Sequence, residues 1–339
     1  MESTEFRLGI DIEVLSDDEE VSVQHMRVKR IENLDKCKQL KKLSIVASCV
    51  DEIKGLEQNS ELRELELYQG LVKEIRNVGH LTNLRVLDLS FNEIKRIENI
   101  DSLINLEKLY LSNNKISLIE GLGNLVNLKV LELGSNKIRS LESSCLRNLG
   151  KLEELWLGKN KINSIKGDEF SSMRLPNLRQ LSLQSNRLTE WNHLLFSHIA
   201  PNLENVYFGS NQLPDMDPET LKAVNKDKLV ELDISSNCLA QVPQFPEPMS
   251  KLEELWLNDN LISYTDSLVT LGTIFPSLRT FYIERNPVQK ECPLDCRLTI
   301  QRNGPPTLEQ MDATMIPQRE LTVSFKEVES SSTKPILKK

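Results

Sequence analysis

One pattern dominates this sequence: L-x-x-L-x-L-x-x-N-x-(I/L/V) recurs eleven times between Leu40 and Val288. The spacing between copies is 22 residues for the first four intervals and 23 to 26 residues for the others. The first leucines are Leu40, Leu62, Leu84, Leu106, Leu128, Leu152, Leu178, Leu203, Leu229, Leu252 and Leu278. A segment this short cannot bury its leucines alone, so the copies must stack in order into a solenoid.

The pattern is typical of leucine-rich repeats, in which each copy supplies one short parallel strand and a return segment. In the early copies the return segments carry apolar residues every third position, as in Val72, Ile75, Val78 and Leu81. A period of three indicates 3₁₀ geometry, and the longer later segments favour short helical turns. We therefore predict an α/β leucine-rich-repeat solenoid with a concave parallel β-sheet, convex 3₁₀ or short α segments, and a cap at each end.

Asparagine fills the ninth place of the motif in nine of the eleven copies, and only Ser48 and Gly70 differ. A buried amide carries donors and an acceptor, so it can satisfy backbone groups where each strand turns away. We expect these residues to be structural.

The chain is expected to form one domain, because a solenoid grows in one dimension and needs no second core. The expected segments are an acidic disordered N-terminus, a degenerate N-capping repeat that includes Val21, Val23 and Val28, the eleven repeats, a C-terminal cap and a disordered tail. Their boundaries are residues 1–17, 18–39, 40–288, 289–316 and 317–339.

Composition narrows the protein class. The sequence has no apolar run long enough to cross a bilayer, and Met1 to Glu20 lacks the basic and apolar regions of a signal peptide. We expect a cytosolic or nuclear protein without a membrane partner.

Of the six cysteines only Cys292 and Cys296 lie close together, at a spacing that could suit a metal site or a disulfide. No second pair or histidine cluster would complete a metal site, so we expect no metal and no cofactor.

The fifth place of the motif lies between two core-facing leucines, so strand alternation turns it to the opposite side of the sheet. Five of the chain's eight Tyr and Trp residues fall in this column of eleven, together with four acids. The column reads Ser44, Glu66, Asp88, Tyr110, Glu132, Trp156, Ser182, Tyr207, Asp233, Trp256 and Tyr282. The third place adds Glu64, Glu154, Glu231 and Glu254, and the eighth adds Phe91 and Asp259.

Strands favour aromatic residues and surfaces favour charges, but neither preference explains one continuous column of them. Rigid aromatic rings among polar groups are typical of protein-binding hot spots. Acids would repel phosphate backbones, and the net charge is −8, so nucleic acid is not expected as a partner. The four histidines lie outside the strand motifs, and we predict no catalytic residues.

Several strings resemble those of the leucine-rich-repeat regulatory subunits of protein phosphatase 1, and the resemblance covers Val21 to Ile316. The strings are LELGSNKI (131–138), LGKNKI (157–162), LQSNRLT (183–189), WLNDNL (256–261), YIERNPVQK (282–290) and MDAT (311–314). Generic leucine-rich repeats share the leucines but not these strings.

The resemblance implies a noncatalytic subunit that binds the phosphatase catalytic subunit through its concave face and controls its activity, maturation or location. It also implies a nuclear and cytoplasmic protein active in mitotic chromosome segregation, and a second phosphatase inhibitor protein in a ternary complex. Family contacts carried over by position are Asp88, Tyr110, Glu132, Trp156, Asp233, Glu254, Trp256 and Tyr282, to which the column adds Glu66 and Tyr207.

The sequence departs from the family pattern in two places. Copies from Leu128 onward are longer than the uniform family repeats, and the tail beyond Ile316 is extra. Within the tail, Val323 and Phe325 approximate a short phosphatase-docking motif, but Leu321 stands where that motif has a basic residue. The alternative function is a structural protein–protein scaffold in a nuclear ribonucleoprotein or an axonemal assembly.

Overall fold

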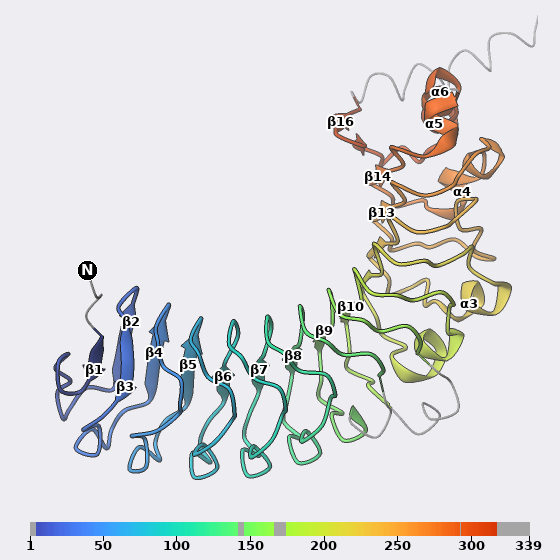
Figure 1. Ribbon diagram of the computed structural model, residues 1–339. Helices are drawn as coiled ribbons and strands as arrows, with labels where there is room; N and C mark the ends of the chain where they lie inside the picture. Colours follow the sequence, from blue (N-terminus) through green and yellow to red (C-terminus); the bar gives the residue numbers. More distant parts are fainter. Residues whose placement is uncertain (1–4, 142–145, 166–173, 292, 317–339) are drawn as a thin grey trace, which may run out of the picture. The chain divides into compact units, whose positions relative to one another are not determined.

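The computed structural model describes residues 5–141, 146–165, 174–291 and 293–316 (Figure 1). The chain divides into two compact units, where the sequence suggested a single domain. Unit 1 is Met1–Arg187 with His198–Pro201, and unit 2 is Leu188–Ser197 with Asn202–Lys339. No helix among the described residues has both the length and the apolar character that a membrane span requires.

Unit 1 is a ladder of parallel strands, one from each coil of the solenoid (Figure 1). In this ladder β2 pairs with β4, and each strand from β4 to β9 pairs with its successor, while β1 pairs separately with β3. The strands are β1 (Phe6–Leu8), β2 (Glu20–Gln24), β3 (Val28–Ile31), β4 (Lys42–Val46), β5 (Glu64–Tyr68), β6 (Val86–Asp88), β7 (Lys108–Tyr110), β8 (Val130–Glu132), β9 (Glu154–Trp156) and β10 (Gln180–Ser182).

Unit 2 continues the same architecture with more helix. Its strands are β11 (Asn205–Tyr207), β12 (Glu231–Asp233), β13 (Glu254–Trp256), β14 (Thr280–Tyr282), β15 (Gln310–Met311) and β16 (Thr314–Met315). Its helices are α3 (Pro218–Ala223), the 3₁₀ helix η2 (Asp266–Leu268), α4 (Leu271–Ile274), α5 (Pro287–Glu291) and α6 (Pro293–Asn303). A π-helical turn, η1 (Leu195–Ile199), contains residues of both units. The leucine-rich-repeat solenoid predicted from the sequence is confirmed.

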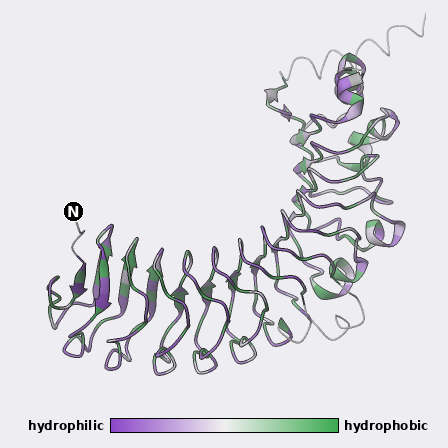
Figure 2. Ribbon diagram, viewed as in Figure 1, coloured by the Kyte–Doolittle hydropathy of each residue, from purple (hydrophilic) through white to green (hydrophobic). Residues whose placement is uncertain are grey.

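The core is the stack of motif leucines and return-segment apolar residues. Leu84, Leu87 and Leu89 of one copy, and Ile94, Ile97 and Ile100 after them, are all 0 or 1% exposed. Hydrophobic and hydrophilic positions therefore recur at the same places in successive coils, as Figure 2 shows. Each coil buries its apolar residues against the coil on either side, which is the stacking that the repeat length requires.

The three-residue period of the early return segments has a specific hydrogen-bond basis. The amide of Leu81 donates to Val78 (2.9 Å), and that of Leu84 donates to Leu81 (2.9 Å). These are the i to i−3 bonds of 3₁₀ geometry, but they occur once every three residues. They therefore form a series of single turns, and η2 is the one 3₁₀ helix in the described ranges.

The motif asparagines form a ladder that joins each coil to the one before it. Asn136 illustrates the geometry: its Oδ1 accepts from the Ile116 amide (2.9 Å), and its Nδ2 donates to the carbonyls of Leu111 (2.9 Å) and Leu133 (3.0 Å). Equivalent bonds to the preceding coil are made by Asn92, Asn114, Asn160, Asn186, Asn237, Asn260 and Asn286. The structural role predicted for these residues is confirmed.

A second ladder, which the sequence analysis did not identify, runs along the return side of unit 1. Asn77 and Asn99 have positive φ (58° and 61°), and their Nδ2 atoms donate to Ile53 (2.8 Å) and Ile75 (2.7 Å) of the preceding coil. Gly121 takes the equivalent place with φ 71°, and a Cβ there would lie 2.5 Å from the Ile97 carbonyl. At this place the chain needs either a residue that tolerates left-handed geometry or no side chain at all.

Much of the N-terminal segment expected to be disordered is ordered. From Glu5 onward it is described, and β1 pairs in parallel with β3. The reason is apolar burial, because Leu8 (0% exposed) and Val14 (1% exposed) lie in the core of unit 1. The neighbouring Arg7 pairs with Asp11 (2.9 Å) at the surface. The acidic composition of residues 1–17 concealed these two apolar anchors.

Unit 2 ends in α5, α6 and the antiparallel pair β15–β16. Cys296 and Ile300 of α6 are fully buried. Asp312 caps the end of the last repeat strand, because its Oδ1 accepts hydrogen bonds from the amides of Ile283 (2.7 Å) and Glu284 (2.8 Å). Cys292 and the tail residues 317–339, including Val323 and Phe325, lie outside the described residues.

The ladder predicts unequal costs for the same substitution at two asparagines. Asn136→Ala strips partners from buried backbone groups of two coils, and should lower the free energy of unfolding by about 3 kcal/mol. The matched control is Asn105→Ala, which removes a single bond to Thr82 (2.9 Å) from an exposed side chain and should cost less than about 1 kcal/mol. Urea unfolding followed by circular dichroism measures both, and equal losses would contradict the ladder.

Candidate binding face

The third- and fifth-place residues project from the side of each sheet opposite the leucine core. Each three-residue strand buries its central residue, and the strands pair in register, so fifth-place side chains stand beside one another. In unit 1 the column runs Ser44, Glu66, Asp88, Tyr110, Glu132, Trp156 and Ser182, and in unit 2 Tyr207, Asp233, Trp256 and Tyr282. We call these, with their third-place neighbours, the unit 1 face and the unit 2 face.

All ten predicted contact residues are half-buried on these faces. The unit 1 face holds Glu66, Asp88, Tyr110, Glu132 and Trp156, and the unit 2 face holds Tyr207, Asp233, Glu254, Trp256 and Tyr282. The structure therefore brings the predicted residues of each unit into one column. Their role in binding stays a prediction.

Carboxylates dominate the unit 1 face, and serines of the seventh motif place orient them. Asp88 accepts from the Ser90 amide (2.8 Å), and Ser112 donates its hydroxyl to Glu132 (2.6 Å). Burial raises the pKa of Asp88, and the nearby charge of Glu66 and Glu132 raises it further. The unit 1 face therefore carries fixed, partly desolvated negative charge.

Each face also carries a tryptophan held by the glutamate two residues earlier on the same strand. Trp156 Nε1 donates to Glu154 (3.0 Å), and Trp256 Nε1 donates to Glu254 (3.4 Å). Residues two apart on a strand point to the same side, which makes this pairing possible. Each indole thus keeps its polar edge satisfied and presents an apolar surface to solvent.

The unit 2 face adds an aromatic platform. The rings of Trp256 and Tyr282 stack with centroids 4.1 Å apart and planes 11° from parallel. Tyr207 donates its hydroxyl to Glu231 (2.7 Å), and its pKa rises to about 12, chiefly through burial. Two ordered rings beside carboxylates provide a large contact area that loses little side-chain entropy on binding.

Gly209 in the seventh motif place makes room for Asp233. A Cβ at Gly209 would lie 2.9 Å from Asp233 Oδ2. The same carboxylate accepts from the Ser235 amide (2.9 Å) and hydroxyl (2.6 Å). Sequence reasoning missed these supporting residues, although the small residues recurring in the seventh place were the available signal.

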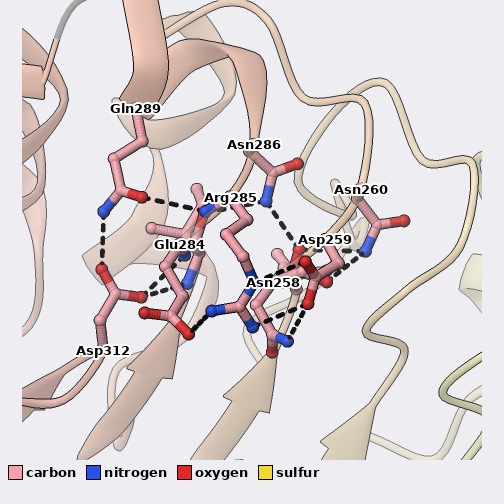
Figure 3. Close-up of polar contacts among 10 residues, drawn as sticks. Asn258, Asp259, Asn260, Glu284, Arg285, Asn286, Gln289 and Asp312 are labelled. Carbon is pink, nitrogen blue, oxygen red and sulfur yellow. Dashed lines mark hydrogen bonds and ion pairs between the residues drawn. The ribbon is translucent and has the colours of Figure 1, made fainter.

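A separate polar cluster lies in the last coils of unit 2 (Figure 3). The Asp259 carboxylate accepts hydrogen bonds from both Nε (2.6 Å) and Nη2 (2.8 Å) of Arg285. The same guanidinium also donates to Glu284. The guanidinium bonds lower the pKa of Asp259. A cavity of about 1030 Å³ adjoins the cluster and is lined by Arg285, Asp312 and residues of α5 and α6. The Arg285 and Asp312 side chains there hold neighbouring coils together.

Among the side chains that the structure describes, no group of three or more His, Cys, Asp or Glu could hold a metal ion. Cys296 is buried in α6, and burial raises the pKa of its thiol to about 11, so the thiolate is disfavoured.

The comparisons with known proteins agree with the architecture. Two family models described as leucine rich repeat match residues 126–188 and residues 105–125. A search of the curated proteins finds no match.

Solved leucine-rich-repeat structures superpose over most of the chain. An internalin from Listeria monocytogenes has a TM-score of 0.72 at 21% identity, covering 91% of this chain and 85% of that chain. A Leptospira interrogans leucine-rich-repeat protein has a TM-score of 0.72 at 23% identity, covering 86% and 71%. The ectodomain of an Arabidopsis thaliana receptor kinase has 0.65 at 18%, covering 86% and 35%. Such identities show the fold, one that generally serves as a noncatalytic protein-interaction scaffold.

The raised pKa of Asp88 gives a pH-dependent prediction. The folded state holds this proton more tightly than the unfolded chain, so ionisation costs stability as pH rises through the interval between the two pKa values. Asp88→Asn keeps the acceptor for Ser90 and removes the charge. We expect its urea midpoint to exceed that of the unchanged chain at pH 7. The difference should shrink as the pH is lowered into the acid range, and a constant difference would contradict this assignment.

Proposed function

We propose that this chain is a noncatalytic regulatory subunit that binds the catalytic subunit of protein phosphatase 1 through the unit 1 face and the unit 2 face. Binding would control the activity, maturation or location of the phosphatase. The observation that carries the proposal is the column of acids and aromatic rings, with a glutamate-held tryptophan on each face. A protein partner suits these faces better than a small ligand, because they are broad and built from flat strands.

The sequence supports the choice of partner. The strings shared with the phosphatase regulators include Trp256 and Tyr282, which form the stacked pair. Glu132 also falls within them, on the unit 1 face. The proposal therefore rests on a resemblance in short strings and on a surface composition typical of binding hot spots, and the two share these residues.

Further parts of the proposal concern context. We place the protein in the nucleus and cytoplasm, with a role in mitotic chromosome segregation. A second phosphatase inhibitor protein would share the complex. Affinity purification from dividing cells tests these parts, and a ribonucleoprotein or axonemal assembly as the dominant partner would favour the alternative scaffold function.

Tryptophan truncation tests the two faces separately. Trp156→Ala and Trp256→Ala should each weaken binding of the purified phosphatase catalytic subunit by about 2 kcal/mol or more, because each removes a half-buried anchor. Both should leave the thermal midpoint nearly unchanged. The matched control is Tyr264→Ala, which truncates an aromatic side chain that is 74% exposed and outside the column. Interferometry with the immobilised catalytic subunit measures all three, and unaltered binding by the Trp156/Trp256 double variant would refute the proposal.

The tail offers a second contact to test. Val323 and Phe325 would add a short strand to the phosphatase in the manner of docking motifs. Deletion of residues 317–339 should then weaken binding several-fold while the faces retain most of the affinity. A second variant replaces only Val323 and Phe325 by Ala in the full chain. Unchanged affinity in both variants would remove the tail from the interface.

A further inference from the structure

The tenth place of the motif, just after the ladder asparagine, forms a second column in unit 1. From the second copy onward, after Cys49 of the first, it reads Leu71, Glu93, Lys115, Lys137, Lys161 and Arg187. Each of these residues donates its backbone amide to the preceding coil, with all six distances 2.7 or 2.8 Å. The column is therefore fixed by the backbone, with one residue for every coil, about 4.8 Å apart.

Three cations of this column have no partner that the fold supplies. Lys115 pairs with Glu93 (3.0 Å). For Lys137, Lys161 and Arg187, no ion pair or side-chain hydrogen bond is present among the described residues. Like charges aligned on adjacent strands destabilise a sheet, and the same holds for adjacent coils. Folding alone does not account for this run of positive charge.

Two exposed apolar side chains lie at the other end, Leu71 in the column itself and Phe91 in the eighth motif place, two residues before Glu93. Phe91, one coil before Lys115, is 42% exposed, and Leu71, two coils before it, is 43% exposed. The Phe91 ring lies against Tyr68 with centroids 5.0 Å apart. Exposed apolar side chains at this end can accept one apolar side chain of a partner.

We propose that this column is a docking row for an extended acidic segment of a partner protein, anchored by an apolar side chain at Phe91 and Leu71. The coil that contains Lys137 lies about 10 Å from the coil that contains Phe91, and the coil that contains Arg187 lies about 19 Å from it. An extended chain advances about 3.3 Å per residue. The acids of the partner segment should therefore follow or precede its apolar anchor by about three to six residues.

A protein segment fits the row better than nucleic acid does. Strong phosphate binding needs many cations, and this row offers three unpaired ones. The apolar step at Phe91 also suits a side chain of an acidic peptide better than a phosphate backbone.

The row is separate from the surface in the proposed function, because the unit 1 face consists of third- and fifth-place residues and the row consists of tenth-place residues with Phe91. An experiment on it therefore tests the row alone, whether or not the faces bind a phosphatase. Fluorescence anisotropy with the full chain and the labelled peptide Phe-Gly-Ser-Glu-Glu-Glu-Glu, at low ionic strength, is the direct measurement.

The triple variant K137E/K161E/R187E should bind this peptide at least about tenfold more weakly, since three surface pairs become repulsive. The control K36E/K38E/K54E changes net charge equally at exposed lysines away from the row, and should bind as the unchanged chain does. Equal weakening in both variants would overturn the proposal, because attraction would then depend on net charge alone.

Two further measurements test the anchor and the class of partner. Replacing Phe by Ser in the peptide, or Phe91→Ser in the protein, should each weaken binding several-fold. An oligothymidine of similar charge should bind more weakly than the peptide. Tighter binding of the oligonucleotide, or no effect of either serine, would overturn the assignment.

The thermal midpoint separates a docking role from a structural one. Lys161→Glu removes like-charge repulsion between neighbouring coils, so its midpoint should stay level or rise while peptide binding falls. A lowered midpoint would show that Lys161 serves the fold, and would count against the row.

Discussion

The rest of the structure depends on a buried side-chain amide that recurs in nine of the eleven repeats. Each ladder asparagine uses its oxygen for a backbone amide of the preceding coil and its nitrogen for carbonyls of both coils, as at Asn136. Stacked leucines supply most of the favourable free energy, but hydrophobic contact does not fix a register by itself. The amide does, because its bonds reach specific backbone atoms one coil away. Where Gly70 replaces asparagine, the missing side chain leaves space for Asn92 of the next coil.

Because the register is fixed, residues at the same motif place form a column across successive coils. Because strands pair residue for residue, every fifth-place side chain has the fifth-place residues of adjacent coils as neighbours. The column of acids and rings therefore follows from the motif alone. The same reasoning applies to the core leucines and the ladder asparagines.

Other features did not follow from the motif, and the reasons are physical. Gly209 and Ser235 position Asp233 through close contacts that depend on side-chain rotamers. The β1–β3 pair depends on two apolar anchors within an acidic stretch, where composition pointed to disorder. The period of three in the return segments predicted the correct bonds, but periodicity does not reveal whether such bonds run consecutively. A repeat motif also carries no signal for where a long stack divides into compact units.

The two columns of unit 1 carry charge of opposite sign: the fifth place holds the acids Glu66, Asp88 and Glu132, and the tenth place holds Lys115, Lys137, Lys161 and Arg187 after Glu93. The fifth place holds carboxylates such as Asp88, whose burial makes its charge costly. The tenth place holds Lys137 and Lys161, which lie in line with like charges. The buried charge of Asp88 and the aligned cations of the tenth place each lower the stability of the fold slightly. The fold remains stable because the burial of the leucine stack outweighs these small costs. Substitutions that ease such local strain commonly stabilise a protein and reduce its binding. The separation also gives each surface its own selectivity, since a basic partner surface is attracted to the fifth-place column and repelled by the tenth, and an acidic segment the reverse.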